Sequence, residues 1–220
     1  MTAPLPHPEV WRASELAAPA HPVCPTGWAA LDAVLPGGGW PLGAVVELHM
    51  PAPALPWRLL LPALRTASAQ GLVVLVGLPL QPHVAAWAAQ GIATARLWRV
   101  QPRDEREVLW CAEQLLTCPD VALCWLHSQR PPLAWIQRLQ QAAAAAQRPV
   151  EGTGWPAPLV VLSRPSGVET GGGSVAPLRL QVQVEGAAAL CVRVLKRRGP
   201  PLAQPLHLPA PWPWSEWCPS

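Results

Sequence analysis

The sequence predicts an α/β protein whose sheet is mostly parallel and ends in an antiparallel edge. Strand-like and helix-like segments alternate along the chain, which is typical of βαβ units. Uninterrupted apolar runs, such as residues 72–76 and 121–126, are typical of parallel strands that are buried on both faces. Near the end, segments 178–184 and 190–195 flank a turn at Glu185-Gly186, which predicts an antiparallel pair. A chain of 220 residues is long enough for one well-cored domain.

Local signals place the elements in order. Residues 1–25 are rich in Pro and Ala and predict an irregular N-terminal arm. Thr26 is the candidate N-cap of the first helix, and Asp104 is that of a later amphipathic helix. Residues 26–204 form the expected domain, with helices at 28–35, 57–69, 83–90, 105–116 and 132–147, and strands at 45–48, 72–76, 95–100, 121–126, 158–163, 178–184 and 190–195.

The segment after the first strand lies where α/β proteins place a phosphate-binding loop. Such a loop uses glycines to turn backbone N–H groups inward, Lys for the phosphates and Ser or Thr for Mg²⁺. The segment from Met50 to Trp57 has no Gly, Lys or hydroxyl, and its three prolines have no N–H to donate. We therefore expect the frame of a nucleotide site without its chemistry, and neither a bound cofactor nor a metal ion.

The opening of the domain resembles the start of the RecA/RadA recombinase core. The resemblance rests on Thr26-Gly27, Leu31-Asp32, the run Gly37-Gly38-Gly39-Trp40-Pro41-Leu42-Gly43 and Val46-Glu47-Leu48. With Val10-Trp11-Arg12 and Lys196-Arg197-Arg198-Gly199-Pro200, the chain resembles in particular the ImuA family, RecA-like accessory proteins of the damage-inducible mutagenesis cassette of bacteria. This resemblance covers roughly residues 9 to 205. It implies a RecA-like three-layer core with a degenerate phosphate loop, in which Leu55, Pro56 and Trp57 replace the last loop Gly, the Lys and the Thr.

Two further groups of a RecA-type ATPase are missing. Such an enzyme uses a Glu after the strand that follows the loop helix, and an Asp at the end of a later apolar strand. Residues 71–102 contain no Asp or Glu, and the strand at 121–126 ends in His127-Ser128. The six histidines are scattered, without a neighbouring nucleophile motif, and Glu105 and Glu107 alternate with arginines as on a solvated helix start. We therefore expect no catalytic residues and no enzymatic activity.

Lys196, Arg197 and Arg198 form the first candidate contact site. In RecA-type filaments basic residues at this place reach the neighbouring protomer's nucleotide, so these three are either a basic finger or an ordinary solvated strand end. The segment 164–176, with three consecutive glycines, lies where the second DNA-binding loop of RecA would be and is expected to be a flexible connector. It has no aromatic residue to stack on a base, so DNA contact should be weak or indirect.

Residues 205–220 form the second candidate contact site, a Pro/Trp-rich C-terminal tail. Trp212, Trp214 and Trp217 lie among prolines, which exclude a helix and favour an extended chain. These indoles either bind a partner or fold back onto the surface of their own domain.

Composition limits the setting. The net charge of +3 is too small to indicate nucleic-acid binding by itself. The six cysteines include no C-x-x-C pair, which favours reduced thiols in the cytoplasm. The start of the chain lacks the features of a signal peptide, and no apolar run is long enough to span a membrane. We expect a cytoplasmic protein that is nucleoid-associated when engaged.

The resemblance implies a non-catalytic adaptor of damage-induced (SOS) translesion DNA synthesis. Its expected partners are an ImuB-like Y-family protein, an error-prone DnaE-type polymerase reached indirectly, and RecA. One alternative is a cell-division inhibitor of the SulA type, which is also RecA-like and binds FtsZ. Another is an ATPase with an unusual site, against which the prolines of the loop argue.

Overall fold

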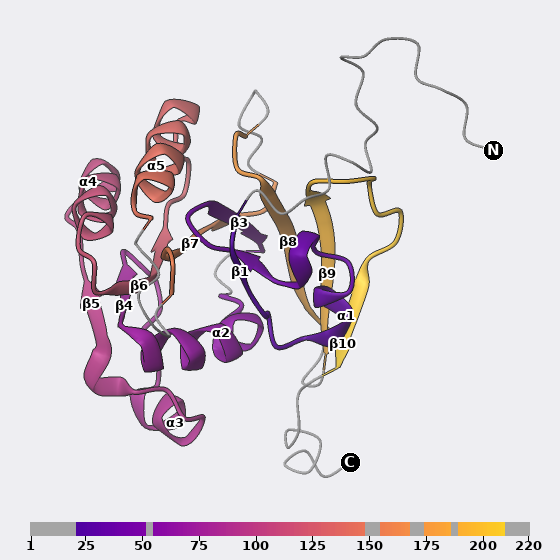
Figure 1. Cartoon of the computed structure of the whole chain (residues 1–220), viewed down its shortest axis with the longest axis horizontal. Helices are drawn as coiled ribbons and strands as arrows, with labels where there is room; N and C mark the ends of the chain where they lie inside the picture. Colours follow the sequence, from indigo (N-terminus) through magenta and orange to yellow (C-terminus); the bar gives the residue numbers. More distant parts are fainter. Residues whose placement is uncertain (1–20, 52–54, 148–154, 168–173, 186–188, 210–220) are drawn as a thin grey trace.

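The computed structural model describes residues 21–51, 55–147, 155–167, 174–185 and 189–209. Within these residues, helices cover both faces of an eight-stranded sheet, and a two-stranded hairpin lies beside it (Figure 1). The elements are, in order, β1 (Val23–Cys24), α1 (Ala29–Asp32), β2 (Trp40–Pro41), β3 (Val45–Met50), α2 (Trp57–Gln70), β4 (Leu72–Val76), α3 (Val84–Ala89), β5 (Leu97–Val100), α4 (Glu105–Leu116), β6 (Val121–His127), α5 (Leu133–Ala145), β7 (Leu159–Pro165), β8 (Leu178–Glu185), β9 (Ala189–Lys196) and β10 (Leu206–Pro209).

The strand order across the large sheet is β10-β9-β8-β3-β7-β6-β4-β5. The strands from β5 to β8 run parallel to one another, whereas β9 and β10 are antiparallel to their neighbours. The prediction of a mostly parallel sheet with an antiparallel edge is therefore confirmed.

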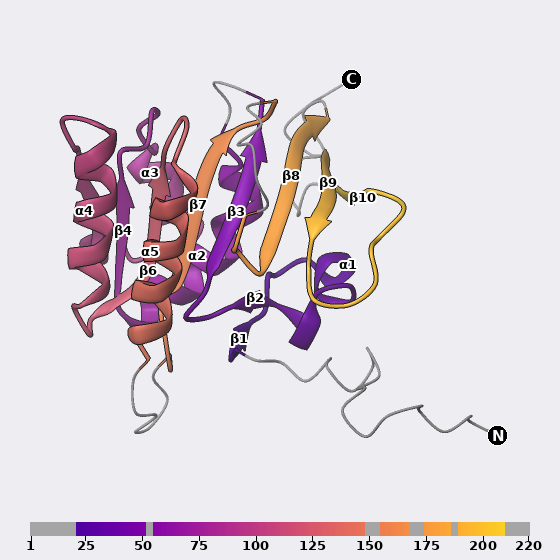
Figure 2. The same ribbon diagram turned by 90° about the horizontal axis from the view of Figure 1, so that it is seen from above.

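Two apolar clusters lie on opposite faces of this sheet. One is built around α2 and contains Leu48 and Leu75 from the sheet, and the other is built around α4 and α5 and contains Val74 and Val160. All residues of β3 and β6 are buried, and for β6 this agrees with the apolar run that predicted it. Figure 2 shows that α4 and α5 cover the parallel strands but do not extend over β8, β9 and β10. The outer face of the antiparallel edge is thus not covered by a helix of the described chain.

Several predicted elements are confirmed in detail. The bounds of β4 and α4 agree with the predicted ranges of 72–76 and 105–116. Asp104 caps α4 as expected, because its Oδ1 accepts hydrogen bonds from the backbone N–H groups of Arg106 and Glu107, both at 2.9 Å. β8 ends at Glu185 and pairs antiparallel with β9, which begins at Ala189, while the predicted turn between them lies outside the described residues.

The first helix differs from its prediction. Instead of a helix over 28–35, α1 has four residues and is followed by a 3₁₀ turn at Pro36–Gly38. Thr26 does not cap this helix, because its hydroxyl accepts from the N–H of Trp28, one residue before α1 begins.

The glycine run directly precedes β2, which forms with β1 a two-stranded hairpin that the sequence did not predict. β1 pairs antiparallel with β2, so residues 23–24 belong to this hairpin and not to the irregular arm. A side chain at Gly39 would place its Cβ 2.1 Å from the carbonyl oxygen of Cys24, so only glycine fits this crossing. The next residue, Trp40, is then completely buried in the core.

Two further differences lie near the C-terminal end. β10 occupies residues 206–209, inside the stretch predicted as the tail, and pairs antiparallel with β9. β7 extends to Pro165, so Arg164 is a fully buried strand residue and not part of a flexible connector. The structure does not describe residues 1–20 and 210–220. Among the residues that it does describe, no helix has the length and apolar character needed to cross a membrane.

Candidate functional site

The connection from β3 to α2 lies where α/β proteins place a phosphate loop, and its end is packed into the core. Leu55 and Pro56 are buried, as is Met50 at the end of β3, whereas Pro51 is exposed. The indole of Trp57 makes edge-to-face contacts with Trp125, at a centroid distance of 4.7 Å, and with Trp87, at 5.1 Å. Aromatic side chains of the fold itself therefore pack against one another where α2 begins. Residues 52–54 of this segment lie outside the described part.

The backbone at the start of α2 is also turned toward its own chain. The N–H of Trp57 donates to the carbonyl oxygen of Leu55 at 2.9 Å, and Pro56 has no N–H. In a phosphate loop the corresponding N–H groups surround the phosphate oxygens. Pro56 and Trp57 therefore have no free backbone N–H group that could bind a phosphate.

The ends of β6 and β7 carry polar side chains that hydrogen-bond to one another and to the backbone. The hydroxyl of Ser163 donates to the carbonyl oxygen of Leu126 at 3.1 Å, so it must accept from the indole N–H of Trp125 and from Nδ1–H of His127. Neutral His127 then presents Nε2 as an acceptor, and Gln129 donates to it at 3.2 Å. Burial lowers the pKa of His127, which outweighs the opposing effect of Glu105. The imidazole is therefore held neutral between two partners.

A carboxylate does lie beside this strand end, but it comes from another element. Glu105, in the first turn of α4, accepts from the backbone N–H of Gln129 at 2.9 Å and from the hydroxyl of Ser128. The interpretation of Glu105 as part of a solvated helix start missed this contact, because residues 105 and 128 are far apart in the sequence. The carboxylate holds the segment after β6 in place.

A buried charged network that the sequence did not predict lies at the centre of the sheet. The carboxylate of Glu47 on β3 is fully buried, as is Arg164 on β7. Glu47 Oε2 lies 3.2 Å from His49 Nε2, 3.4 Å from Arg179 Nε and 3.9 Å from Arg164 Nη1. Its other oxygen accepts from the hydroxyl of Ser174. This one carboxylate joins three strands to the segment before β8.

The cationic surroundings keep Glu47 ionised. Burial raises its pKa, but hydrogen bonds from His49 and Ser174 and the charge of Arg179 outweigh burial, so that the pKa is lowered. Burial and the charge of Arg179 lower the pKa of Arg164, whereas the charge of Glu47 opposes this shift. A Glu within an otherwise apolar strand, and an Arg at the end of another, were the available sequence signals. Their pairing depends on the register of β3 with β7, which spacing alone does not give.

The structure brings the three predicted basic residues to the end of β9, where two of them bind their own chain. Lys196 Nζ donates to the carbonyl oxygen of Ser174 at 2.7 Å. Arg197 donates to the carbonyl oxygens of Val34 and of Pro200, the latter at 2.9 Å. These two cations therefore hold the segment before β8 and the turn after α1. Arg198 is exposed and lines a neighbouring cleft.

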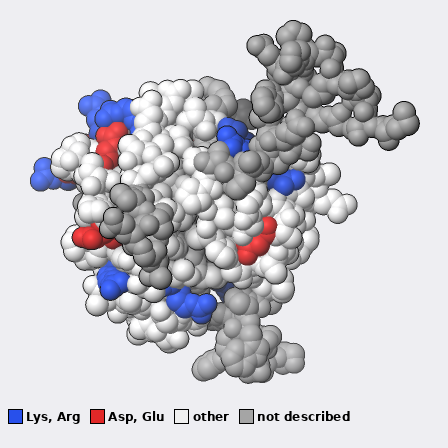
Figure 3. Space-filling view, viewed as in Figure 1, with Lys and Arg blue, Asp and Glu red and all other residues white. Residues whose placement is uncertain are grey.

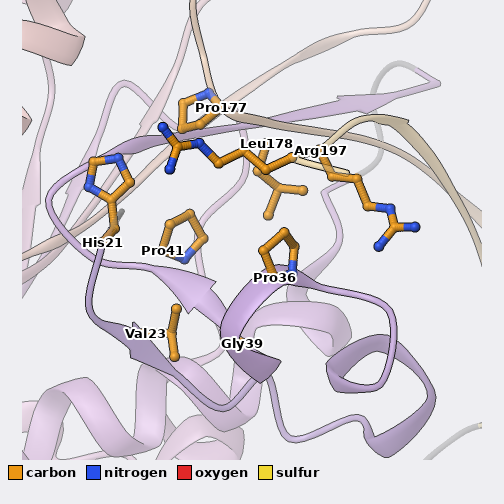
Figure 4. A pocket seen from close by; sticks show the side chains of 9 residues that line it. His21, Val23, Pro36, Gly39, Pro41, Pro177, Leu178 and Arg197 are labelled. Carbon is orange, nitrogen blue, oxygen red and sulfur yellow. The ribbon is translucent and has the colours of Figure 1, made fainter. Parts of the chain in front are cut away.

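That cleft separates the N-terminal hairpin from the start of β8 (Figure 4). Pro36, Pro41 and Pro177 give it apolar walls, while Arg198 and His21 add polar groups. The pKa of His21 is lowered by burial and by the positive charge of Arg198. The arrangement offers an apolar floor beside a guanidinium group, which suits a partner with an apolar side chain next to a carboxylate.

The rest of the described surface does not form a nucleic-acid groove on the face drawn in Figure 3. Lys and Arg form small separate groups there, on a largely uncharged surface. Trp212, Trp214 and Trp217 lie outside the described residues, so their contacts stay a prediction.

No model of a known protein family matches the chain, and the search of curated proteins also found no match.

Proposed function

We propose that the chain is a RecA-like accessory protein of the ImuA type, which acts by binding protein partners and not by hydrolysing a nucleotide. Its role would be that of an adaptor in damage-induced translesion DNA synthesis. The proposed partners are an ImuB-like Y-family protein, through it a DnaE-type polymerase, and RecA. The mostly parallel sheet, with α2 directly after the central strand β3, supports the RecA-like assignment.

The observation that carries this proposal is the packing at the start of α2. Trp57 replaces the hydroxyl residue that would hold Mg²⁺, and its ring packs on Trp87 and Trp125. A nucleotide phosphate would have to displace these rings from an apolar contact. Binding of a triphosphate here is therefore sterically unfavourable.

The polar groups around this place support the same proposal. His127 and Ser163 lie at strand ends where an ATPase needs a carboxylate, and their hydrogen-bonding groups are used within the chain. Glu105 is engaged by Ser128 and Gln129. These side chains stabilise the sheet, and we assign them a structural role.

The proposed contact surface combines the cleft with the C-terminal tail. Arg198 is exposed at the cleft, whereas Lys196 and Arg197 are engaged by backbone carbonyl groups. We propose that Arg198 and the apolar cleft walls meet the RecA-like partner. The tail that follows β10, with its three Trp residues, would bind the polymerase-side partner.

The test is a pull-down of the tagged full chain from DNA-damaged cells, treated with nuclease and analysed by mass spectrometry. We expect an ImuB-like protein and a DnaE-type polymerase to be recovered after the DNA has been digested. Recovery of FtsZ would instead favour the division-inhibitor alternative, and loss of every partner after digestion would favour direct DNA binding.

Two variants locate the contacts. A chain that ends at Pro209 keeps β10, so it should remain folded while losing the ImuB-like partner. Arg198→Glu should weaken recovery of RecA, whereas Arg106→Glu, an exposed charge reversal on α4, is the matched control and should not. Unchanged recovery with the shortened chain would contradict the role of the tail.

A further inference from the structure

Three metal-ligating side chains meet on the outer face of the antiparallel edge. Glu185 ends β8, Cys191 lies on β9 and His207 lies on β10. The thiol sulfur, a carboxylate oxygen and an imidazole nitrogen all lie within 4.8 Å of one another. His207 Nδ1 and Glu185 Oε2 are 2.9 Å apart. Only small side-chain rotations separate these atoms from the spacing of ligands around one metal ion.

Strand register holds this group together. His207 is the direct cross-strand partner of Cys191, and the pair Glu185 and Ala189 closes the β8–β9 ladder two residues away. Because side chains alternate along a strand, Cys191 and His207 point away from the core that Leu190, Val192 and Leu208 enter. The ligands therefore project from three hydrogen-bonded strands, and their mutual positions are set before any ion arrives.

The donor set selects a class of ion. A thiolate and an imidazole favour Zn²⁺ and similar borderline ions over Mg²⁺ and Ca²⁺, which prefer oxygen ligands. One thiolate and one carboxylate together balance the charge of a divalent cation. Glu185 and His207 are exposed and Cys191 is half-buried, so an ion could enter from solvent and keep a water molecule as its fourth ligand.

We propose that Glu185, Cys191 and His207 form a Zn²⁺ site with one open coordination position. The ion would join β8, β9 and the four-residue edge strand β10. Since β10 directly precedes residues 210–220, the ion would also fix the point from which the C-terminal tail extends. The face concerned carries no helix within the described chain, so an ion there remains open to solvent or to a partner's ligand (Figure 2).

The experiment titrates the purified, chelator-treated full chain with Co²⁺ under reducing conditions. We expect one Co²⁺ per chain, with the thiolate-to-cobalt charge-transfer band of a cysteine-ligated ion, and displacement of that ion by Zn²⁺. Cys191→Ser should abolish the band. Glu185→Gln and His207→Gln should each weaken binding by at least about tenfold, since even groups that only orient a ligand contribute 10–100-fold.

Cys111→Ser is the matched control, because Cys111 is also a half-buried free thiol but lies on α4. It should keep the band. Zn²⁺ should also raise the melting temperature of the parent chain but not that of Cys191→Ser, because an ion that binds only the folded state stabilises it. Absence of a charge-transfer band would overturn the proposal. So would a band that survives Cys191→Ser, or one that is lost in Cys111→Ser.

Discussion

The parallel and antiparallel parts of the sheet use their side chains in opposite ways. At the start of α2, the indole of Trp57 packs edge-to-face on those of Trp87 and Trp125. Across β8, β9 and β10, the face that no helix of the described chain covers carries Glu185, Cys191 and His207. The parallel part thus packs large aromatic side chains against one another, whereas the edge presents side chains with ligand-binding atoms to solvent.

The Glu47 network lies where these two parts meet. Glu47 on β3 contacts Arg164 from the parallel side and Arg179 from β8, the first strand of the edge. Lys196 extends the network to the end of β9 through the carbonyl group of Ser174. We therefore expect the charged network around Glu47 to contribute most to the free energy of unfolding, and the packing of Trp57 in the parallel part to contribute less. Titration of the buried imidazole of His127 should change stability least.

Removing the charge of Glu47 should have the largest effect. Glu47→Gln leaves the cationic side chains of Arg164 and Arg179 without their shared carboxylate in a buried place. The free energy of unfolding should fall by about 3–5 kcal/mol, the range for breaking a buried pair. Urea unfolding measures the change.

A surface pair gives the control for this prediction. Glu113→Gln removes the partner of Arg138, whose side chain is 61% exposed, and should cost less than about 1 kcal/mol. In the double variant Glu47→Gln/Arg164→Met, the loss should be smaller than the sum of the single losses, because the two charges interact. Equal effects of Glu47→Gln and Glu113→Gln would contradict the boundary role of the network.

The second prediction concerns Trp57 at the start of α2. Trp57→Thr introduces the hydroxyl residue of the proposed phosphate-loop pattern but removes two edge-to-face contacts. The free energy of unfolding should fall by about 2–4 kcal/mol, somewhat below the cost of losing a fully buried Trp. Chemical denaturation followed by far-UV circular dichroism avoids the loss of a fluorophore.

Trp98→Thr is the matched substitution on β5. Trp98 is 52% exposed, and Thr is well tolerated in a strand, so its cost should stay within about 1 kcal/mol. If Trp57→Thr were as mild as Trp98→Thr, the ring of Trp57 would not fill the site, and the main support for a non-catalytic role would be lost.

The sequence predicted the parallel part of the fold well, because local signals and tertiary structure agree there. Apolar runs gave β4 and β6, and Asp104 marked the start of α4. It missed β1, β2 and β10, which have two to four residues each. Strands this short carry no periodicity, and they exist only because a neighbour supplies the hydrogen bonds.

The sites divide in the same way. The interpretation of Leu55, Pro56 and Trp57 as an altered phosphate loop rests on residues that are contiguous in sequence, and it stays a prediction. The contacts of Glu47 with Arg164 and Arg179, and of Glu185 with Cys191 and His207, depend on which strands become neighbours and in which register. Pairwise spacing in one sequence does not determine that register.

The smallest expected effect is a pH dependence that arises from His127. Burial lowers its pKa in the folded chain, whereas the unfolded chain titrates near its ordinary value of about 6.5. Below that pH the unfolded state binds more protons, so the free energy of unfolding should fall as the pH decreases. The contribution of one group cannot exceed about 1.4 kcal/mol per pH unit.

Comparing His127→Asn with the parent chain isolates this contribution. Asn offers an N–H to Ser163 but does not titrate. The midpoint of urea unfolding of the variant should therefore change less between pH 7.5 and 5.5 than that of the parent chain. The pKa of His21 is also lowered, but it affects both chains equally. Glu47 does not interfere, because its stabilising charge is lost only as the pH falls below the ordinary value for a glutamate, about 4.3. Parallel pH profiles would show that the fold does not hold this imidazole neutral.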